Sequence, residues 1–138
     1  MNKEYFSKDP EETHRIAGKI ASGLQPDCVL ALSGDLGTGK TTFVSGLAQE
    51  LGIEQSITSP TFNIYHLYEG RWLLAHCDAY RLENAGQLEE VMLWDFLVSP
   101  YCLAIEWPEH VRECLPENSL WLYFDILDPG HHRIRVLG

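Results

Sequence analysis

Two segments of the chain have the hydrophobic spacing of amphipathic helices. The first is predicted to begin at Pro10, because Asp9 can act as its N-cap and Glu12 completes a capping box. The second is predicted to run from Lys40 to about Leu51, because its apolar residues recur three and four positions apart. Two less regular helical segments are also expected, at residues 82–97 and 108–114.

Strand-like segments alternate with these helices. Two continuous apolar runs, Cys28–Leu32 and Tyr101–Ile105, are typical of central strands that are covered on both faces. Two hairpins are expected, one joining residues 62–68 to 72–77 and one joining residues 121–127 to 133–137. The sequence therefore predicts one α/β domain over residues 1–138, with a mixed, partly parallel central sheet flanked by helices.

Length and composition narrow the class of protein further. The chain has 138 residues, enough for one domain with a core of its own, and its 45% hydrophobic and 22% charged residues are typical of a globular protein. The longest apolar runs have five residues, so none can span a bilayer, and the N-terminal segment lacks the apolar stretch of a signal peptide. We therefore expect a cytoplasmic protein with no membrane partner.

The charge balance bears on possible partners. Ten lysines and arginines against twenty acidic residues give a net charge of −10. A protein that binds nucleic acid directly usually carries a broad basic face, and this chain has too few cations to form one. Any contact with RNA is therefore expected to run through a partner. The four cysteines and six histidines show no metal-ligand spacing, so no dedicated zinc site is expected.

A phosphate-binding motif lies between the first apolar run and the second helix. Residues 34–41 fit the P-loop pattern G-x-x-x-x-G-K-[ST] at every fixed position. Glycines let successive backbone N–H groups point at phosphate oxygens, and the positive end of the helix dipole adds to the attraction. The predicted nucleotide-binding residues are Gly34, Asp35, Leu36, Gly37, Thr38, Gly39, Lys40, Thr41 and Thr42.

Several side chains in and near this motif carry the predicted chemistry. Lys40 is expected to act at the β- and γ-phosphates, and the Thr41 hydroxyl is expected to bind Mg²⁺. Asp78 and Glu106 each follow an apolar run, where an acid needs a cationic partner such as a metal ion. Lys40, Asp78 and Glu106 are therefore the predicted catalytic residues. Ser59, Pro60 and Thr61 form a loop for which the sequence allows two interpretations: a switch-like segment that contacts the γ-phosphate, or a simple turn.

Four motifs, taken in this order, resemble the TsaE family. They are SGDLGTGKTTF at residues 33–43, SPTF at 59–62, HCDAYRL at 76–82 and IEWPE at 105–109. Proteins of that family are small bacterial ATPases needed to form threonylcarbamoyladenosine on tRNA. The resemblance implies a P-loop NTPase fold, ATP and Mg²⁺ as cofactors, slow ATP hydrolysis by the isolated chain, and the TsaB–TsaD pair as partners.

The resemblance also implies roles for single residues. Thr41 and Glu106 match the family's magnesium-binding positions, and Asp78 matches its other site acid. Glu11 and Arg133 fall near positions that approach the adenine. The sequence departs from the family's usual pattern at Thr38, Asn63, Gly86, Gln87 and Met92.

Three other functions could use the same loop. A small-molecule kinase would need a lid with several arginines, and the six arginines of this chain are scattered. A GTPase-like switch would need an Asn-Lys-x-Asp loop to select guanine, and that sequence does not occur. We therefore expect ATP or ADP as the ligand and keep the kinase as the alternative function. A scaffold that binds ATP without hydrolysing it also agrees with the sequence.

Overall fold

The computed structural model describes residues 2–137. The strands are β1 (Lys3–Ser7), β2 (Cys28–Ser33), β3 (Tyr65–Glu69), β4 (Leu73–Asp78), β5 (Tyr101–Glu106), β6 (Leu120–Asp128) and β7 (His131–Leu137). The helices are α1 (Pro10–Ser22), α2 (Lys40–Glu50), α3 (Ala85–Glu90), α4 (Leu93–Phe96) and the 3₁₀ helix η1 (Pro108–Cys114). Within residues 2–137, no helix has both the length and the apolar content needed to cross a membrane.

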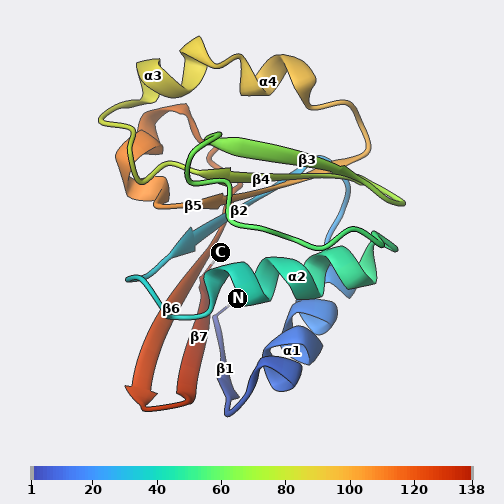
Figure 1. The fold of residues 1–138 in the computed structure, drawn as a ribbon, viewed down its shortest axis with the longest axis vertical. Helices are drawn as coiled ribbons and strands as arrows, with labels where there is room; N and C mark the ends of the chain where they lie inside the picture. Colours follow the sequence, from blue (N-terminus) through green and yellow to red (C-terminus); the bar gives the residue numbers. More distant parts are fainter. Residues whose placement is uncertain (1, 138) are drawn as a thin grey trace.

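The strands form one sheet in the order β1-β7-β6-β2-β5-β4-β3 (Figure 1). The central strands β6, β2, β5 and β4 run parallel to one another. β3 pairs antiparallel with β4 at one side, and β7 and β1 continue the sheet antiparallel at the other. This topology confirms the predicted α/β class with a mixed, partly parallel sheet. Because parallel strands end at a common edge, it also brings the ends of β2, β4 and β5 together.

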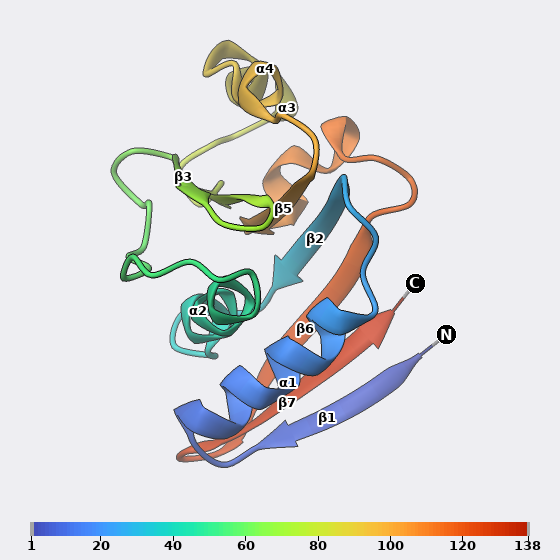
Figure 2. The same ribbon diagram turned by 90° about the vertical axis from the view of Figure 1, so that its right-hand side faces the viewer.

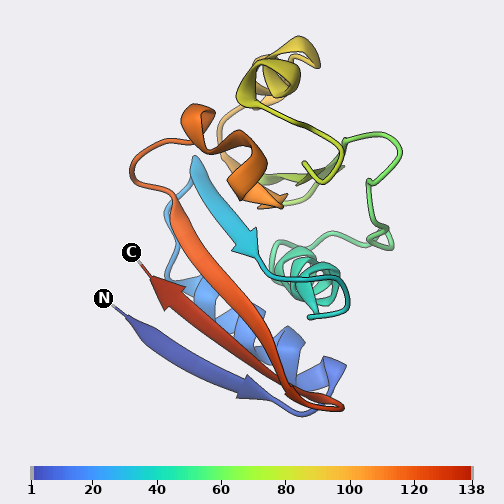
Figure 3. The ribbon, with the colours of Figure 1, turned by 90° about the vertical axis from the view of Figure 1, so that its left-hand side faces the viewer.

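Helices cover both faces of the centre of the sheet. α1 and α2 lie on one face, and α3, α4 and η1 lie on the other (Figures 1 and 2). Along β5, Cys102 and Ala104 pack into the first layer, whereas Leu103 and Ile105 pack into the second. This double coverage explains why the strand is apolar at every position. Figure 3 shows β6, β7 and β1 extending beyond the second layer, with α1 behind them.

Helix α1 begins where the sequence predicts it. Asp9 has extended backbone angles and its carboxylate accepts the backbone N–H of Glu12 at 2.8 Å. The Glu12 carboxylate in turn accepts the backbone N–H of Lys8 at 2.9 Å. The first bond satisfies an N–H group that the first turn of a helix leaves without a partner, and the second holds the backbone of Lys8, the residue before the N-cap.

Three local predictions differ from the structure. The strand expected from residue 62 begins only at Tyr65, because residues 61–63 form a turn and Ile64 has a φ of 70°. The helical segment 82–97 is two short helices, interrupted at Met92, whose φ is 57°. Sequence analysis missed β1, because a short, mostly exposed strand that depends on pairing with β7 carries little hydrophobic pattern.

Gly46 allows the backbones of α1 and α2 to approach each other. A Cβ at this position would lie 2.6 Å from Ala17 Cβ and 2.9 Å from His14 Cα. We expect Gly46→Ala to lower the free energy of unfolding by about 1–3 kcal/mol, because the two helices would have to separate. Gly18→Ala is the matched control, since its Cβ would meet only the flexible Glu50 side chain, at 3.4 Å. Urea denaturation measures both, and a Gly46→Ala protein as stable as the parent would contradict this account.

Candidate functional site

The P-loop joins the end of β2 to the start of α2 and takes backbone conformations that favour glycine. The φ angle is 154° at Gly34, 78° at Gly37 and 99° at Gly39, the N-cap of α2. At Gly34 a Cβ would also lie 2.7 Å from the carbonyl oxygen of Phe124 on β6. Within residues 2–137, no side chain caps the first turn of α2. The loop therefore presents backbone N–H groups that suit phosphate oxygens.

Two hydrogen bonds hold the curve of the loop. The Thr38 hydroxyl donates to the carbonyl oxygen of Asp35 at 2.7 Å. Nδ1 of His132, on β7, lies 2.8 Å from the carbonyl oxygen of Thr38 and must carry the proton of this bond, because a carbonyl only accepts. Sequence analysis gave His132 no role, because a residue in a predicted turn shows no signal that connects it to a loop 94 positions away.

Lys40 is the first residue of α2, and its side chain is almost fully buried. Its ammonium group donates to the carbonyl oxygen of Gly34 and lies 4.4 Å from the centroid of the Trp107 ring. Burial lowers the pKa of Lys40 from its ordinary value, and the nearby carboxylates of Glu106 and Asp78 oppose this shift. The carboxylates of Glu109 and Asp35 act in the same direction, so the ammonium of Lys40 lies among several negative groups.

The two predicted acids end neighbouring parallel strands. Asp78, on β4, and Glu106, on β5, stand opposite each other in the register, and both are buried. The Thr41 hydroxyl, on α2, donates to Glu106 Oε2 at 3.2 Å. The topology of the sheet therefore brings together a helix start and two acids that are far apart in the sequence.

The switch-like loop reaches Asp78 from the other side. The hydroxyl oxygens of Ser59 and Thr61 lie 2.7 Å apart, and Thr61 donates to Asp78 Oδ2 at 3.1 Å. Asp78 Oδ1 accepts the backbone N–H of Tyr80 at 2.9 Å. Both carboxylate oxygens of Asp78 are therefore held, one by the loop and one by the chain that follows β4. Pro60, the middle residue of this loop, is buried and does not line the site.

These groups converge on a cleft of about 520 Å³. Its lining residues are Leu36, Gly37, Gly39, Lys40, Thr41, Thr42, Ser59, Thr61, Asp78, Tyr80, Glu106, Trp107 and His132. Three other predicted P-loop residues, Gly34, Asp35 and Thr38, line a neighbouring hollow of about 500 Å³. Trp107 belongs to both hollows and therefore forms the wall between them.

The donor atoms of the cleft fit a magnesium nucleotide. Thr41 Oγ1 and Glu106 Oε2 lie 3.2 Å apart and could both act as oxygen ligands, and Mg²⁺ in nucleotide sites takes one or two protein oxygens together with phosphate oxygens and water. The glycine loop and the start of α2 could hold the phosphates, with the ammonium of Lys40 beside them. These residues could therefore bind the magnesium ion and the phosphate groups of the nucleotide.

Glu11 and Arg133, expected near the adenine, lie outside this cleft. Glu11 lines a hollow between α1 and α2. Arg133 Nη2 forms an ion pair of 3.0 Å with Asp125 Oδ2 on β6. Their proposed position near an adenine stays a prediction.

Sequence analysis also missed one buried polar residue. His76 lies on β4, two residues before Asp78, and its Nε2 is 2.6 Å from Glu106 Oε2. The available signal was a histidine inside an otherwise apolar strand, which by itself does not reveal the acid on the neighbouring strand.

Comparison with known proteins identifies relatives that match most of this chain. Residues 7–134 match the family model described as "Threonylcarbamoyl adenosine biosynthesis protein TsaE". The TsaE protein of Treponema pallidum is 35% identical over 130 residues, covering 94% of this chain and 96% of that protein. The TsaE protein of Bacillus subtilis is 41% identical over 113 residues, covering 81% of this chain and 70% of that protein.

A solved structure agrees with these sequence relationships. The crystal structure of Bacillus subtilis YdiB superposes with a TM-score of 0.80 at 34% sequence identity, covering 99% of this chain and 84% of that one. The fold, the four motifs and the extent of the matches lead to one conclusion: this chain belongs to the TsaE family.

Proposed function

We propose that this protein binds ATP with Mg²⁺, hydrolyses it slowly when alone, and supports the TsaB–TsaD pair in forming threonylcarbamoyladenosine on tRNA. The observation that carries the ATPase part is the convergence of Thr41, Glu106, Asp78 and Lys40 on the cleft at the start of α2. The family to which the chain belongs supports the part that concerns tRNA modification. The proposal includes a cytoplasmic location, where ATP and tRNA meet.

Each group in the cleft has a distinct task in this proposal. Backbone N–H groups of the P-loop and Lys40 bind the phosphates, and Thr41 and Glu106 hold Mg²⁺, which neutralises charge on the phosphate oxygens. Asp78 orients the attacking water or a water bound to the metal. The hydrogen bond from Thr61 to Asp78 then connects this orientation to the switch-like loop.

The arginines favour hydrolysis over transfer to a small-molecule acceptor. All six lie within residues 2–137, and none lines the cleft. Arg81 stacks over Phe62, Arg112 over Trp121 and Arg135 over Tyr123; Arg15 pairs with Glu12, Arg71 contacts the backbone of Glu50, and Arg133 pairs with Asp125. A kinase lid that gathers phosphates would need some of these guanidinium groups at the cleft.

Replacing Lys40 tests the nucleotide site directly. We expect Lys40→Ala and Lys40→Met to weaken Mg·ATP binding about tenfold to more than a hundredfold, because a charge-assisted contact of roughly 1.5–3 kcal/mol is lost. Lys40→Met keeps an aliphatic stem beside Trp107, so it separates the charge from the packing. Fluorescence titration with ATP, ADP and GTP measures the dissociation constants.

Lys3→Ala, on the exposed part of β1, is the control and should bind as the parent does. The parent should prefer ATP or ADP to GTP. Folded Lys40 variants that bind ATP with parental affinity would refute the proposed nucleotide site.

A further inference from the structure

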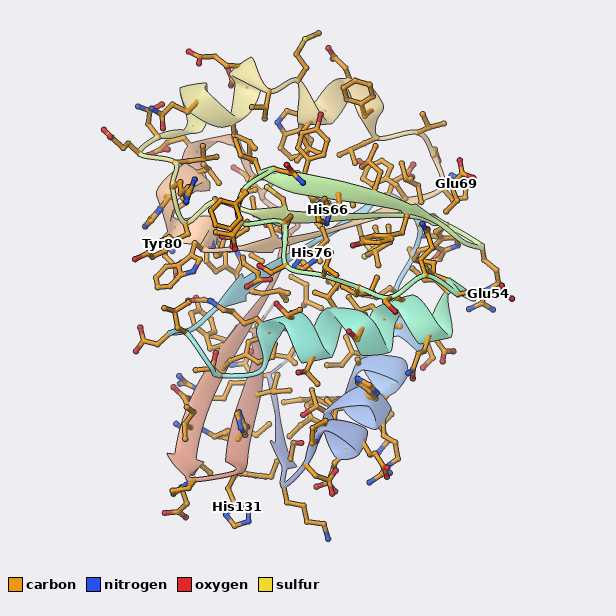
Figure 4. All side chains as sticks on the ribbon, in the orientation of Figure 1. Glu54, His66, Glu69, His76, Tyr80 and His131 are labelled. Atoms are coloured by element: carbon orange, nitrogen blue, oxygen red, sulfur yellow. The ribbon has the colours of Figure 1, made fainter. Side chains whose placement is uncertain are left out.

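His76 is a polar residue in a position that suits an apolar one. It lies near the end of β4 (Figure 4). Its side chain is fully buried. Its neighbours Ala75 and Cys77 pack into the layer of α3, α4 and η1, whereas Leu74 packs into the layer of α1 and α2. Because side chains alternate along a strand, His76 lies on the same side as Leu74, between β4 and α2. Leucine would satisfy packing there without the cost of burying an imidazole.

One short hydrogen bond explains why a polar imidazole occupies this buried position. His76 Nε2 lies 2.6 Å from Glu106 Oε2, the oxygen that also accepts the Thr41 hydroxyl at 3.2 Å. His76 Nδ1 is buried and forms no hydrogen bond with any of the described residues. A buried N–H without an acceptor is costlier than one that donates, so the proton lies on Nε2 and points at the carboxylate.

We propose that His76 is a positioning residue that fixes the Glu106 carboxylate for magnesium. A glutamate side chain has three rotatable bonds, and the donor from His76 removes the freedom of its last one by holding Oε2 beside Thr41. Oε1 is then set in a constant direction relative to the P-loop. His76 itself does not touch the metal or the nucleotide. This inference rests on the magnesium site of the proposed function.

The contacts of the two site acids show why Glu106 needs such a partner. Asp78 is held from both oxygens by the protein, through the Thr61 hydroxyl and the Tyr80 backbone N–H. Glu106 receives one bond from Thr41, whose hydroxyl would turn its lone pairs toward a bound metal. When that hydroxyl serves the metal, the bond from His76 is the remaining constraint on Glu106 among the contacts that the structure describes. Partners of metal ligands of this kind typically alter metal affinity about 10–100-fold.

Three substitutions separate the hydrogen bond from the packing. His76→Gln can place an amide N–H near the position of Nε2, whereas the shorter His76→Asn reaches only to the position of Nδ1. His76→Leu keeps the volume and removes every donor. The dissociation constant of a fluorescent ATP analogue is measured with saturating Mg²⁺ and with excess chelator, and the ratio of the two gives the magnesium-dependent gain in affinity. Thermal unfolding without nucleotide verifies the fold of each variant.

We expect His76→Leu and His76→Asn to lose about tenfold or more of the magnesium-dependent gain, and His76→Gln to keep it within about threefold. Affinity in chelator should stay within about threefold of the parent for all three, which a general structural defect would not produce. If His76→Leu does not fold, the difference in magnesium-dependent gain between His76→Gln and His76→Asn tests the proposal. Equal gains in those two variants would overturn the role of His76. A parent protein with no magnesium-dependent gain would instead refute the proposed function on which this role depends.

Discussion

Replacing Glu106 with alanine should lower magnesium-dependent ATP hydrolysis by at least about 100-fold, which corresponds to roughly 2.7 kcal/mol of transition-state stabilisation. In our proposal the carboxylate is the charged oxygen ligand beside Thr41, so its removal would leave Mg²⁺ with a neutral hydroxyl and the phosphates. Mg·ATP affinity should fall as well, whereas affinity measured in chelator should not. Steady-state phosphate release and titration with and without Mg²⁺ measure both effects.

Asp78 should behave differently from Glu106 because the protein holds it differently. Its oxygens bind Thr61 and the backbone after β4, and in our proposal it orients water. Asp78→Ala should therefore reduce turnover more than it reduces Mg·ATP binding. Glu113→Gln removes the charge of an exposed carboxylate on η1 outside the cleft and is the control for the loss of a negative charge elsewhere on the protein. If the Asp78 and Glu106 variants both hydrolyse ATP at the parental rate, the two acids are structural and the mechanism is wrong.

The parts of the site that can be predicted are those whose residues form a recognisable pattern within a short stretch of sequence. The P-loop was recognisable because its glycines, lysine and threonine are contiguous and their spacing follows from backbone geometry. Asp78 and Glu106 were recognisable because each follows an apolar run, and parallel strands end at the same edge of a sheet. The fold class followed from the same alternation of apolar runs and amphipathic helices.

The unpredicted parts depend on contacts between distant segments. His76 and His132 are single histidines whose partners lie 30 and 94 positions away, so no local pattern identifies them. β1 forms a strand because it pairs with β7 at the edge of the sheet. The helical segment is interrupted at Met92, which has a positive φ, and nothing in the sequence predicts that a methionine takes this conformation. In each case contacts in the tertiary structure determine the conformation or the role of the residue, and the local sequence gives almost no information about either.

Among residues 2–137, no arginine lines the cleft. In P-loop hydrolases an arginine that meets the transition-state charge on the γ-phosphoryl group raises the rate about 10³–10⁵-fold. Arg81, the nearest internal candidate in the sequence, lies with its guanidinium carbon 4.7 Å from the centroid of the Phe62 ring and does not line the cleft. Phe62 is 81% exposed and Leu36, on the cleft, is 75% exposed. Exposed apolar side chains beside an incomplete site suit a partner that covers it.

The ATPase rate should therefore rise at least tenfold when the TsaB–TsaD pair is added and should not change with tRNA alone. A partner can supply either an arginine or a fixed position for the loop Ser59–Thr61, and both act on the γ-phosphoryl group. The net charge of −10 opposes direct tRNA binding, since most of this surface repels phosphates. Phosphate release is measured for the protein alone, with tRNA, with the pair, and with both. Bovine serum albumin at equal mass controls for non-specific stabilisation. Rapid hydrolysis by the isolated chain, or tight and salt-sensitive tRNA binding without the pair, would contradict this dependence on a partner.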